Sequence, residues 1–170
     1  MNNEFEIKPA TSEDVSLILS FIKELAEYEK LLHEVVATEA ILKETLFGDN
    51  AHAEVVIGYL GSKPVSFALY FHNFSTFLGY PGIYLEDLFV RPEARGMGIG
   101  QKMLAYLAQL ARSRKCGRLE WRVLDWNETA IKFYKRIGAK PLDDWIVYRL
   151  TGEPLDNLAK SCEVSPQNFV

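Results

Sequence analysis

The chain has 170 residues, 48% of them hydrophobic and 25% charged, with a formal net charge of −4 at pH 7. These are the values of an ordinary globular domain, and they exclude wholesale disorder. The mild acidity argues against a nucleic-acid binder, which usually carries a basic excess, and it permits a cationic small-molecule substrate. The two cysteines, Cys116 and Cys162, have neither disulfide nor zinc spacing. We therefore expect reduced thiols in a cytoplasmic protein and no metal site.

Hydrophobic periodicity and turn-forming residues divide the chain into short strands and amphipathic helices. In chain order they predict a strand at 5–7, helices from residue 11 and at 38–47, strands at 53–60, 65–71 and 83–90, a helix at 98–114, a strand at 119–124, a helix at 127–136 and a strand at 145–150, before a polar tail after residue 151. The early hairpin implies antiparallel pairing, and the later strand–helix alternation implies parallel pairing. The expected fold class is α+β (mixed α/β), with helices on both faces of one mixed sheet.

Capping residues mark two of the predicted helix starts. Thr11 is an N-cap with Asp14 at the capping-box position, and Thr38 caps the second helix, which Gly48 ends.

One stretch, 64–85, contains no charged residue and is long enough to suggest a membrane span. Its middle contains polar and turn-forming residues, including His72, Gly79 and Pro81, which split it into two apolar strands. The N-terminus lacks the basic start and apolar run of a targeting segment. We therefore expect neither a membrane segment nor a targeting segment.

A glycine-rich run, Arg95-Gly96-Met97-Gly98-Ile99-Gly100, lies directly between a predicted strand and a predicted helix. Its glycines allow a tight turn with outward backbone N–H groups, the helix N-terminus adds partial positive charge, and Arg95 adds a full one. This combination suits a pyrophosphate group. The spacing fits neither the dinucleotide-binding fingerprint nor the P-loop. A glycine-rich turn without a ligand is the alternative.

Two adjacent carboxylates, Glu86 and Asp87, interrupt a strand that is otherwise apolar on both faces. Such a strand is expected to be central and covered on both sides. Strict alternation places Glu86 on the face of Tyr84 and Asp87 on the opposite face. Because buried unpaired charge is costly, the carboxylates need partners. A structural ion pair, for example with Arg122 or Lys23, and the binding of a substrate ammonium are both open.

The glycine-rich run resembles the acyl-CoA pyrophosphate loop of the GNAT superfamily of N-acetyltransferases. A second run, Asn127 to Ala139, is similar to that superfamily's second signature, in the right order and at a fitting separation. A narrower resemblance, carried by residues 22–29, 84–90 and 95–100, is to the spermidine/spermine N-acetyltransferases, a group that includes thialysine acetyltransferases. The resemblance extends from about Phe5 to about Leu150.

This resemblance implies a mostly antiparallel sheet whose parallel strand pair splays in the middle to admit the pantetheine arm. It implies one N-acetyltransferase domain over 1–170, with a core of about 5–150 and a tail at 151–170. The expected co-substrate is acetyl-CoA, and the acceptor is a small primary amine that attacks directly in a ternary complex. The family also implies a homodimer.

The resemblance assigns residues to two sides of one cleft. Toward acetyl-CoA it places Leu88, Phe89, Val90, Arg95, Gly96, Met97, Gly98, Ile99, Gly100, Gln101, Asn127, Tyr134 and Arg136. Toward the amine it places Tyr28, Glu29, Glu86, Asp87, Trp121 and Arg122.

Two residues receive catalytic roles from the same resemblance. Tyr134 is the expected general acid that protonates the leaving thiolate, and a core tyrosine beside Phe133 is the alternative. Glu86 takes the proton of the substrate ammonium through water, or binds that ammonium. For Asn127 the alternative is a helix N-cap alone, and for Tyr28 and Glu29 it is a solvated helix end.

Arg122 departs from the polyamine members of the family. It would repel a long polycation, and it would suit a substrate carboxylate, as in a lysine analogue. The acceptor is therefore open among a polyamine or diamine, a lysine-like amine, and an amino-acid or protein amine. A non-catalytic acyl-CoA-binding module is the alternative of a different class.

Overall fold

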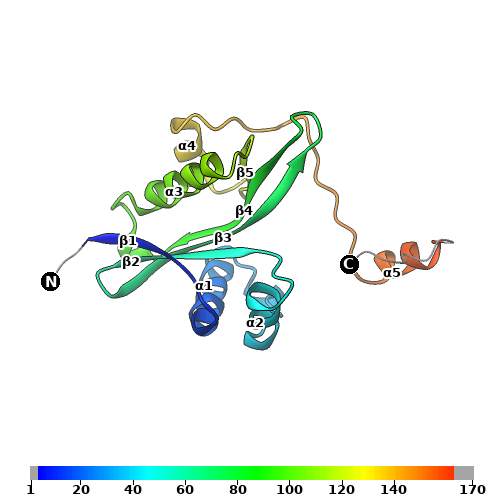
Figure 1. Cartoon of the computed structure of the whole chain (residues 1–170), viewed down its shortest axis with the longest axis horizontal. Coiled ribbons are helices and arrows are strands. Elements are labelled where there is room, and N and C mark those ends of the chain that lie inside the picture. The colour runs from blue at the N-terminus through cyan, green and yellow to red at the C-terminus, as the bar shows by residue number, and fades with distance from the viewer. Residues whose placement is uncertain (1–3, 163–170) are drawn as a thin grey trace. The chain divides into compact units, whose positions relative to one another are not determined.

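Residues 4–162 are described by a computed structural model, in which the chain divides into two units between Arg122 and Val123 (Figure 1). The first unit contains a five-stranded sheet whose strands follow one another in chain order. They are β1 (Phe5–Pro9), β2 (Glu54–Leu60), β3 (Lys63–Ser75), β4 (Tyr80–Val90) and β5 (Leu119–Trp121). Neighbouring strands are antiparallel except for β4 and β5, which are parallel. The predicted mixed, mostly antiparallel sheet is therefore confirmed.

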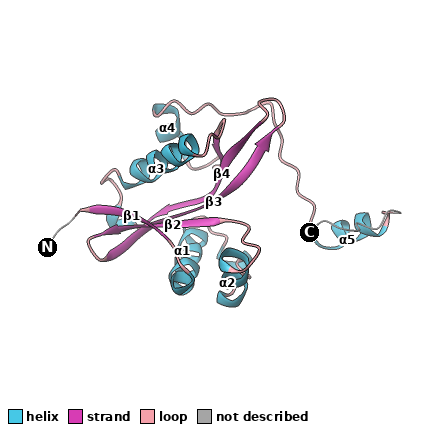
Figure 2. Cartoon of the chain, viewed as in Figure 1, coloured by secondary structure: helices cyan, strands magenta, loops and turns pink. Residues whose placement is uncertain are grey.

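Helices cover both faces of this sheet, as predicted, with α1 and α2 against one face and α3 against the other (Figures 1 and 2). The helices of the first unit are η1 (Ser12–Asp14), α1 (Val15–Tyr28), η2 (Leu32–Glu34), α2 (Glu39–Phe47), η3 (Pro92–Ala94) and α3 (Ile99–Ser113). Beneath α1 and α2, the fully buried rings of Phe21 and Phe67 stack with centroids 5.2 Å apart. Burying one such side chain contributes about 1.5–3 kcal/mol, so this face of the sheet anchors α1 firmly.

The predicted helix starts are confirmed. The Thr11 N–H donates to Asp14 Oδ2 at 2.8 Å, and the expected capping box of Thr11 and Asp14 is present at the start of η1. Thr38 Oγ1 accepts the Ile41 N–H at 3.2 Å, and Gly48 follows the last residue of α2. Both signals act within a single turn, which is why the sequence alone locates them.

The parallel pair between β4 and β5 is short. It runs from Ile83 opposite Leu119 to Leu85 opposite Trp121, while β4 continues to Val90. Within the first unit no strand lies beside the outer edge of β4 over 86–90. The two strands thus separate after Leu85, at the end of the sheet rather than in its middle.

The second unit contains α4 (Glu128–Arg136) and α5 (Gly152–Lys160). The strand predicted at 145–150 is wrong, because these residues lie outside regular secondary structure. Alternating apolar residues favour a strand, but a strand also needs a neighbour for its backbone groups, and no described strand pairs with this segment. The predicted strand at 119–124 likewise ends at Trp121. The predicted polar tail carries α5, and its residues 163–170 lie outside the described part.

The uncharged stretch 64–85 forms strands β3 and β4, as predicted. No helix between residues 4 and 162 is both long enough and apolar enough to cross a membrane.

Candidate active site

The glycine-rich loop 95–100 joins η3 to α3. Gly96 and Gly98 have φ angles of +78° and +74°, the left-handed region in which glycine avoids the strain of a side chain. A Cβ at either position would meet nothing within 4 Å, so conformation rather than crowding calls for glycine. Gly98 is the N-cap of α3, whose first N–H groups have no partner within the helix. The loop therefore offers an exposed, electropositive turn that suits phosphate.

Arg95 connects this loop to the end of α1. Its Nε donates to the Val90 carbonyl oxygen at 2.9 Å. Its guanidinium carbon lies 4.7 Å from the centroid of the Tyr28 ring and 5.5 Å from that of Phe89. Tyr28, which was predicted on the amine side, thus stacks on the arginine predicted on the phosphate side. No local sequence signal indicated this contact.

The pairing between β3 and β4 shifts by one residue at Glu86. Leu69 lies opposite Asp87, while the next residue, Tyr70, lies opposite Leu85. Glu86 is therefore the extra residue of a β-bulge. Bulges redirect side chains near functional sites. At this bulge the side chains of Glu86 and Asp87 no longer follow the alternation between the two faces that a regular strand would impose.

The bulge corrects the predicted division of faces. Phe71 lies opposite Tyr84 and Leu69 opposite Asp87, and directly opposed residues point to the same face. Since Leu69 and Phe71 alternate on one face of β3, Tyr84 and Asp87 share that face too. Leu69 packs on the core beneath α1 and α2, so this is the face of α1. The prediction that Asp87 lies opposite to Tyr84 is wrong.

Asp87 lies within a group of charges. Burial raises the pKa of its carboxyl, repulsion from Glu86 and Glu29 raises it further, and Arg122 opposes the rise, leaving the pKa at about 6. Within the first unit the Asp87 side chain makes no hydrogen bond or ion pair. A largely buried carboxylate with no partner is costly, and a ligand cation would relieve that cost.

Glu86 does have a partner. Arg122 Nη2 donates to Glu86 Oε1 at 3.0 Å, and its guanidinium carbon lies 5.8 Å from the Tyr84 ring centroid. The predicted alternative of an ion pair with Arg122 is thus present. Both side chains are about 40% exposed, and exposed pairs of this kind contribute only about 0–1 kcal/mol. Stability therefore does not explain why Arg122 stands here.

Glu29 completes the acidic side. It is the C-cap of α1, and burial raises the pKa of its carboxyl. Three carboxylates, Glu29, Glu86 and Asp87, thus face one guanidinium, that of Arg122. Trp121, the last residue of β5, lies opposite Leu85 at the point where the strands separate. The structure therefore brings Glu29, Glu86, Asp87 and Arg122 together, and their roles toward an amine stay predictions.

Leu88, Phe89 and Val90, which were predicted to bind pantetheine, lie on the unpaired edge of β4. Backbone N–H and C=O groups along an unpaired strand edge are available to an extended ligand. The Phe89 side chain is buried in the core beneath α1, so this residue has only its backbone to offer.

Three further predicted residues lie in the second unit. The Asn127 side chain accepts the Ala130 N–H at 3.3 Å, so it caps α4. The Tyr134 and Phe133 rings lie 5.6 Å apart, and burial raises the pKa of the Tyr134 phenol. Arg136 is exposed, with its guanidinium carbon 5.6 Å from the Phe133 ring centroid. Their roles toward the acyl donor stay predictions.

The model of the Acetyltransferase (GNAT) family matches residues 19–139. The chain belongs to this family.

The GNAT chain is 38% identical over 164 residues to a thialysine N-epsilon-acetyltransferase of Bos taurus, covering 90% of this chain and 96% of the relative. It is 31% identical to an L-ornithine N5-acetyltransferase of Arabidopsis thaliana, covering 91% of this chain and 87% of the relative. An integron cassette protein from the mobile metagenome of V. cholerae has a similar structure, with a TM-score of 0.78 and 34% identity over 95% of this chain and 99% of that one. These findings make the chain a GNAT N-acetyltransferase.

Proposed function

We propose that this GNAT enzyme transfers an acetyl group from acetyl-CoA to the primary amine of a small lysine-like or polyamine acceptor. The amine attacks directly in a ternary complex, with no covalent enzyme intermediate. One observation carries the proposal: β4 joins an acidic group, in which three carboxylates (Glu29, Glu86 and Asp87) face the single guanidinium of Arg122, to an electropositive loop at its C-terminal end. An ammonium suits the first, and a pyrophosphate suits the second.

The residues present fit an acyl-CoA. The loop amides and Arg95 would hold the pyrophosphate, and the open space around Gly96 and Gly98 leaves room for it. The unpaired edge of β4 would hydrogen-bond the pantetheine amides. Acetyl-CoA supplies the acetyl group as a reactive thioester.

The acidic group would bind the acceptor and remove its proton. An ammonium has no lone pair with which to attack, so it must lose a proton first. Glu86 keeps its assigned role, through water or by binding the ammonium. The raised pKa of Asp87 suits this neighbouring carboxyl to accept a proton, so proton removal is proposed for the pair. Tyr134 would protonate the leaving thiolate.

Arg122 favours an acceptor that carries a carboxylate. Its guanidinium has five N–H donors, and one of them donates to Glu86, so further donors can take a carboxylate near the bound ammonium. The names of the thialysine and ornithine relatives support the same choice, because both are amino acids. A polycation lacks this interaction and meets repulsion instead.

The test compares amines that differ only in the carboxylate: lysine against cadaverine, and ornithine against putrescine, with free CoA detected by a thiol reagent. We expect kcat/KM for the amino acid to exceed that for its diamine by about tenfold, and Arg122→Gln to abolish the preference. Arg112→Gln, at an exposed arginine of α3, is the control. Preference for the diamines would contradict the role of Arg122. Binding of acetyl-CoA without turnover of any amine would indicate a non-catalytic module.

We also infer a homodimer and a cytoplasmic location. Exposed apolar side chains in the second unit support self-association. Cys116, a buried thiol outside any disulfide, supports a reducing compartment.

A further inference from the structure

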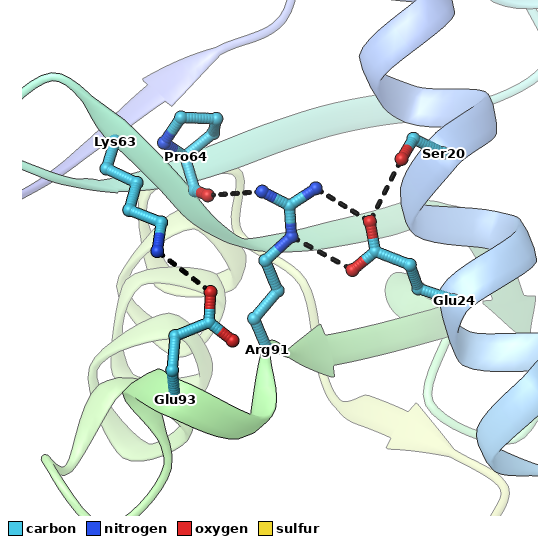
Figure 3. A network of polar contacts seen from close by, with 6 residues as sticks. All are labelled: Ser20, Glu24, Lys63, Pro64, Arg91 and Glu93. Carbon is cyan, nitrogen blue, oxygen red and sulfur yellow. Dashed lines mark hydrogen bonds and ion pairs between the residues drawn. The ribbon is translucent and has the colours of Figure 1, made fainter.

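Arg91, the residue after β4, is held from three directions (Figure 3). Its Nε and Nη2 donate to Glu24 Oε2 and Oε1 at 2.9 and 2.7 Å, a bidentate pair with α1. Its Nη1 donates to the Pro64 carbonyl oxygen at 2.9 Å. The guanidinium carbon lies 4.5 Å from the centroid of the buried Phe21 ring. Ser20 Oγ donates to Glu24 Oε1 at 2.9 Å and so fixes the carboxylate as well.

The Glu24–Arg91 pair is shielded from solvent, with side chains 32% and 18% exposed. Hydrogen bonding to Arg91 lowers the pKa of Glu24, and the same bond raises the pKa of Arg91. Bidentate, partly buried pairs fix geometry more strongly than single exposed ones. The pair therefore defines where α1 and the end of β4 lie relative to each other.

Only the short helix η3 separates Arg91 from the glycine-rich loop. The Arg91 N–H donates to the Val65 carbonyl oxygen, and the Ala94 N–H donates to the Arg91 carbonyl oxygen, both at 2.9 Å. Ala94 is buried, and an ion pair of 2.9 Å joins Glu93 to Lys63 (Figure 3). The segment from Arg91 to the loop thus has little freedom of its own, and the position of Arg91 sets the start of the loop.

Glu24 acts on the same helix face as Tyr28. The two residues are four apart on α1 and therefore lie one turn apart on one face. Each touches an arginine, Glu24 touching Arg91 and Tyr28 touching Arg95, and these too are four residues apart. Helix α1 thus holds the loop at two points, one before it and one at its first residue.

We propose that Glu24 is a positioning residue for the acyl-CoA pyrophosphate: through Arg91 it fixes the glycine-rich loop against α1. This inference rests on the proposed function of the loop. A loop held in its binding geometry before the ligand arrives loses less entropy on binding, so affinity for the acyl donor depends on the pair. Glu24 itself does not touch the ligand.

The chain contains a matched control, a second bidentate pair between Glu54 and Arg114. Arg114 Nη1 and Nη2 both donate to the Glu54 carboxylate. Glu54 is the first residue of β2, and Arg114 is the C-cap of α3, at the opposite end of that helix from the loop. Breaking this pair removes the same type of interaction without touching the loop.

The experiment measures the dissociation constant of acetyl-CoA by calorimetry, the KM for acetyl-CoA, kcat, and Tm for the full chain and five variants. Glu24→Gln and Arg91→Gln should raise the dissociation constant and KM by about tenfold with kcat at saturation within twofold. Arg91→Lys, which keeps the charge but not the fork, should give an intermediate value. Glu54→Gln and Arg114→Gln should lower Tm to a similar degree and leave the dissociation constant within twofold.

If variants of the Glu24–Arg91 pair and variants of the Glu54–Arg114 pair changed the dissociation constant of acetyl-CoA equally, the positioning role would be overturned and only a structural role would remain. An unaltered dissociation constant in Glu24→Gln would overturn it as well. A wild-type chain that does not bind acetyl-CoA would instead overturn the proposed function, and the inference with it.

Discussion

Asp87 carries a cost in the folded chain that its proposed role explains. Burial and two neighbouring carboxylates raise its pKa from 3.8 to about 6, so the folded state holds this proton more tightly than the unfolded chain. The free energy of unfolding therefore falls as the pH rises from about 4 through about 6, and the loss persists at higher pH. Selection for stability alone would remove such a group, and the proposed binding of a cationic acceptor would account for its presence.

Replacing Asp87 with asparagine should remove this penalty. A shift of about two pKa units corresponds to at most about 3 kcal/mol, and residual solvent contact reduces it, so we expect Asp87→Asn to be more stable than wild type by about 2 kcal/mol at pH 7.5. The difference should shrink steadily toward pH 4. Urea unfolding at several pH values measures it, and a difference that does not change with pH would contradict the assignment.

The second prediction for a single residue concerns the hydroxyl of Tyr134, the proposed general acid. Because burial raises the pKa of its phenol, the hydroxyl stays protonated at neutral pH, as a general acid requires. Tyr134→Phe keeps the ring beside Phe133 and removes only the hydroxyl. We expect kcat to fall by about 100-fold with the affinity for CoA within twofold. Tyr148→Phe, at an exposed tyrosine of the same unit, is the control, and equal kcat in both variants would remove the acid role.

At the scale of elements, the loop before α3 gives a prediction with a close internal control. Gly98 and Gly79 have φ angles of +74° and +66°, and a Cβ at either would meet nothing within 4 Å. Gly98→Ala and Gly79→Ala should each lower the free energy of unfolding by about 1 kcal/mol through the same backbone strain. Only Gly98→Ala should weaken acetyl-CoA binding, by about tenfold, because Gly98 lies in the turn where phosphate is proposed to bind. Equal affinities measured by calorimetry would contradict the loop's assignment.

The elements also show which features a sequence alone can predict. The starts of η1 and α2 and the glycine-rich turn depend on residues within one turn, such as Thr38, and these predictions are confirmed. The faces of β4 depend on its pairing with β3, and no residue near Glu86 marks the bulge, so alternation predicted them wrongly. The Glu24–Arg91 pair joins two distant segments and has no local signal either.

For the whole molecule, the family could be predicted from local motifs, whereas part of the architecture could not, because it depends on pairing between distant segments. Two separated signatures predicted a GNAT N-acetyltransferase, and the family match and relatives confirm it. Residues 145–150 have a strand-like sequence, but the neighbour that would pair with them cannot be read from that sequence. No described strand pairs with this segment, so its alternating apolar residues have no neighbouring surface in the described sheet.

That segment carries the prediction of self-association. Trp145, Ile146, Val147 and Tyr148 are consecutive apolar residues that are 71%, 77%, 67% and 89% exposed. Contiguous exposed apolar surface of this kind is typical of an interface, and burying it against a second copy would stabilise the proposed dimer by about 25 cal/mol per Å². We expect light scattering to give twice the chain mass of 19.4 kDa for wild type, and the single-chain mass for a variant with Ile146→Asp and Tyr148→Asp. Phe77 is 92% exposed in the first unit, and Phe77→Asp should leave the mass unchanged. This control shows whether loss of the dimer results from changing residues 145–148 or from removing any exposed apolar side chain. A wild-type chain of single mass would contradict the homodimer.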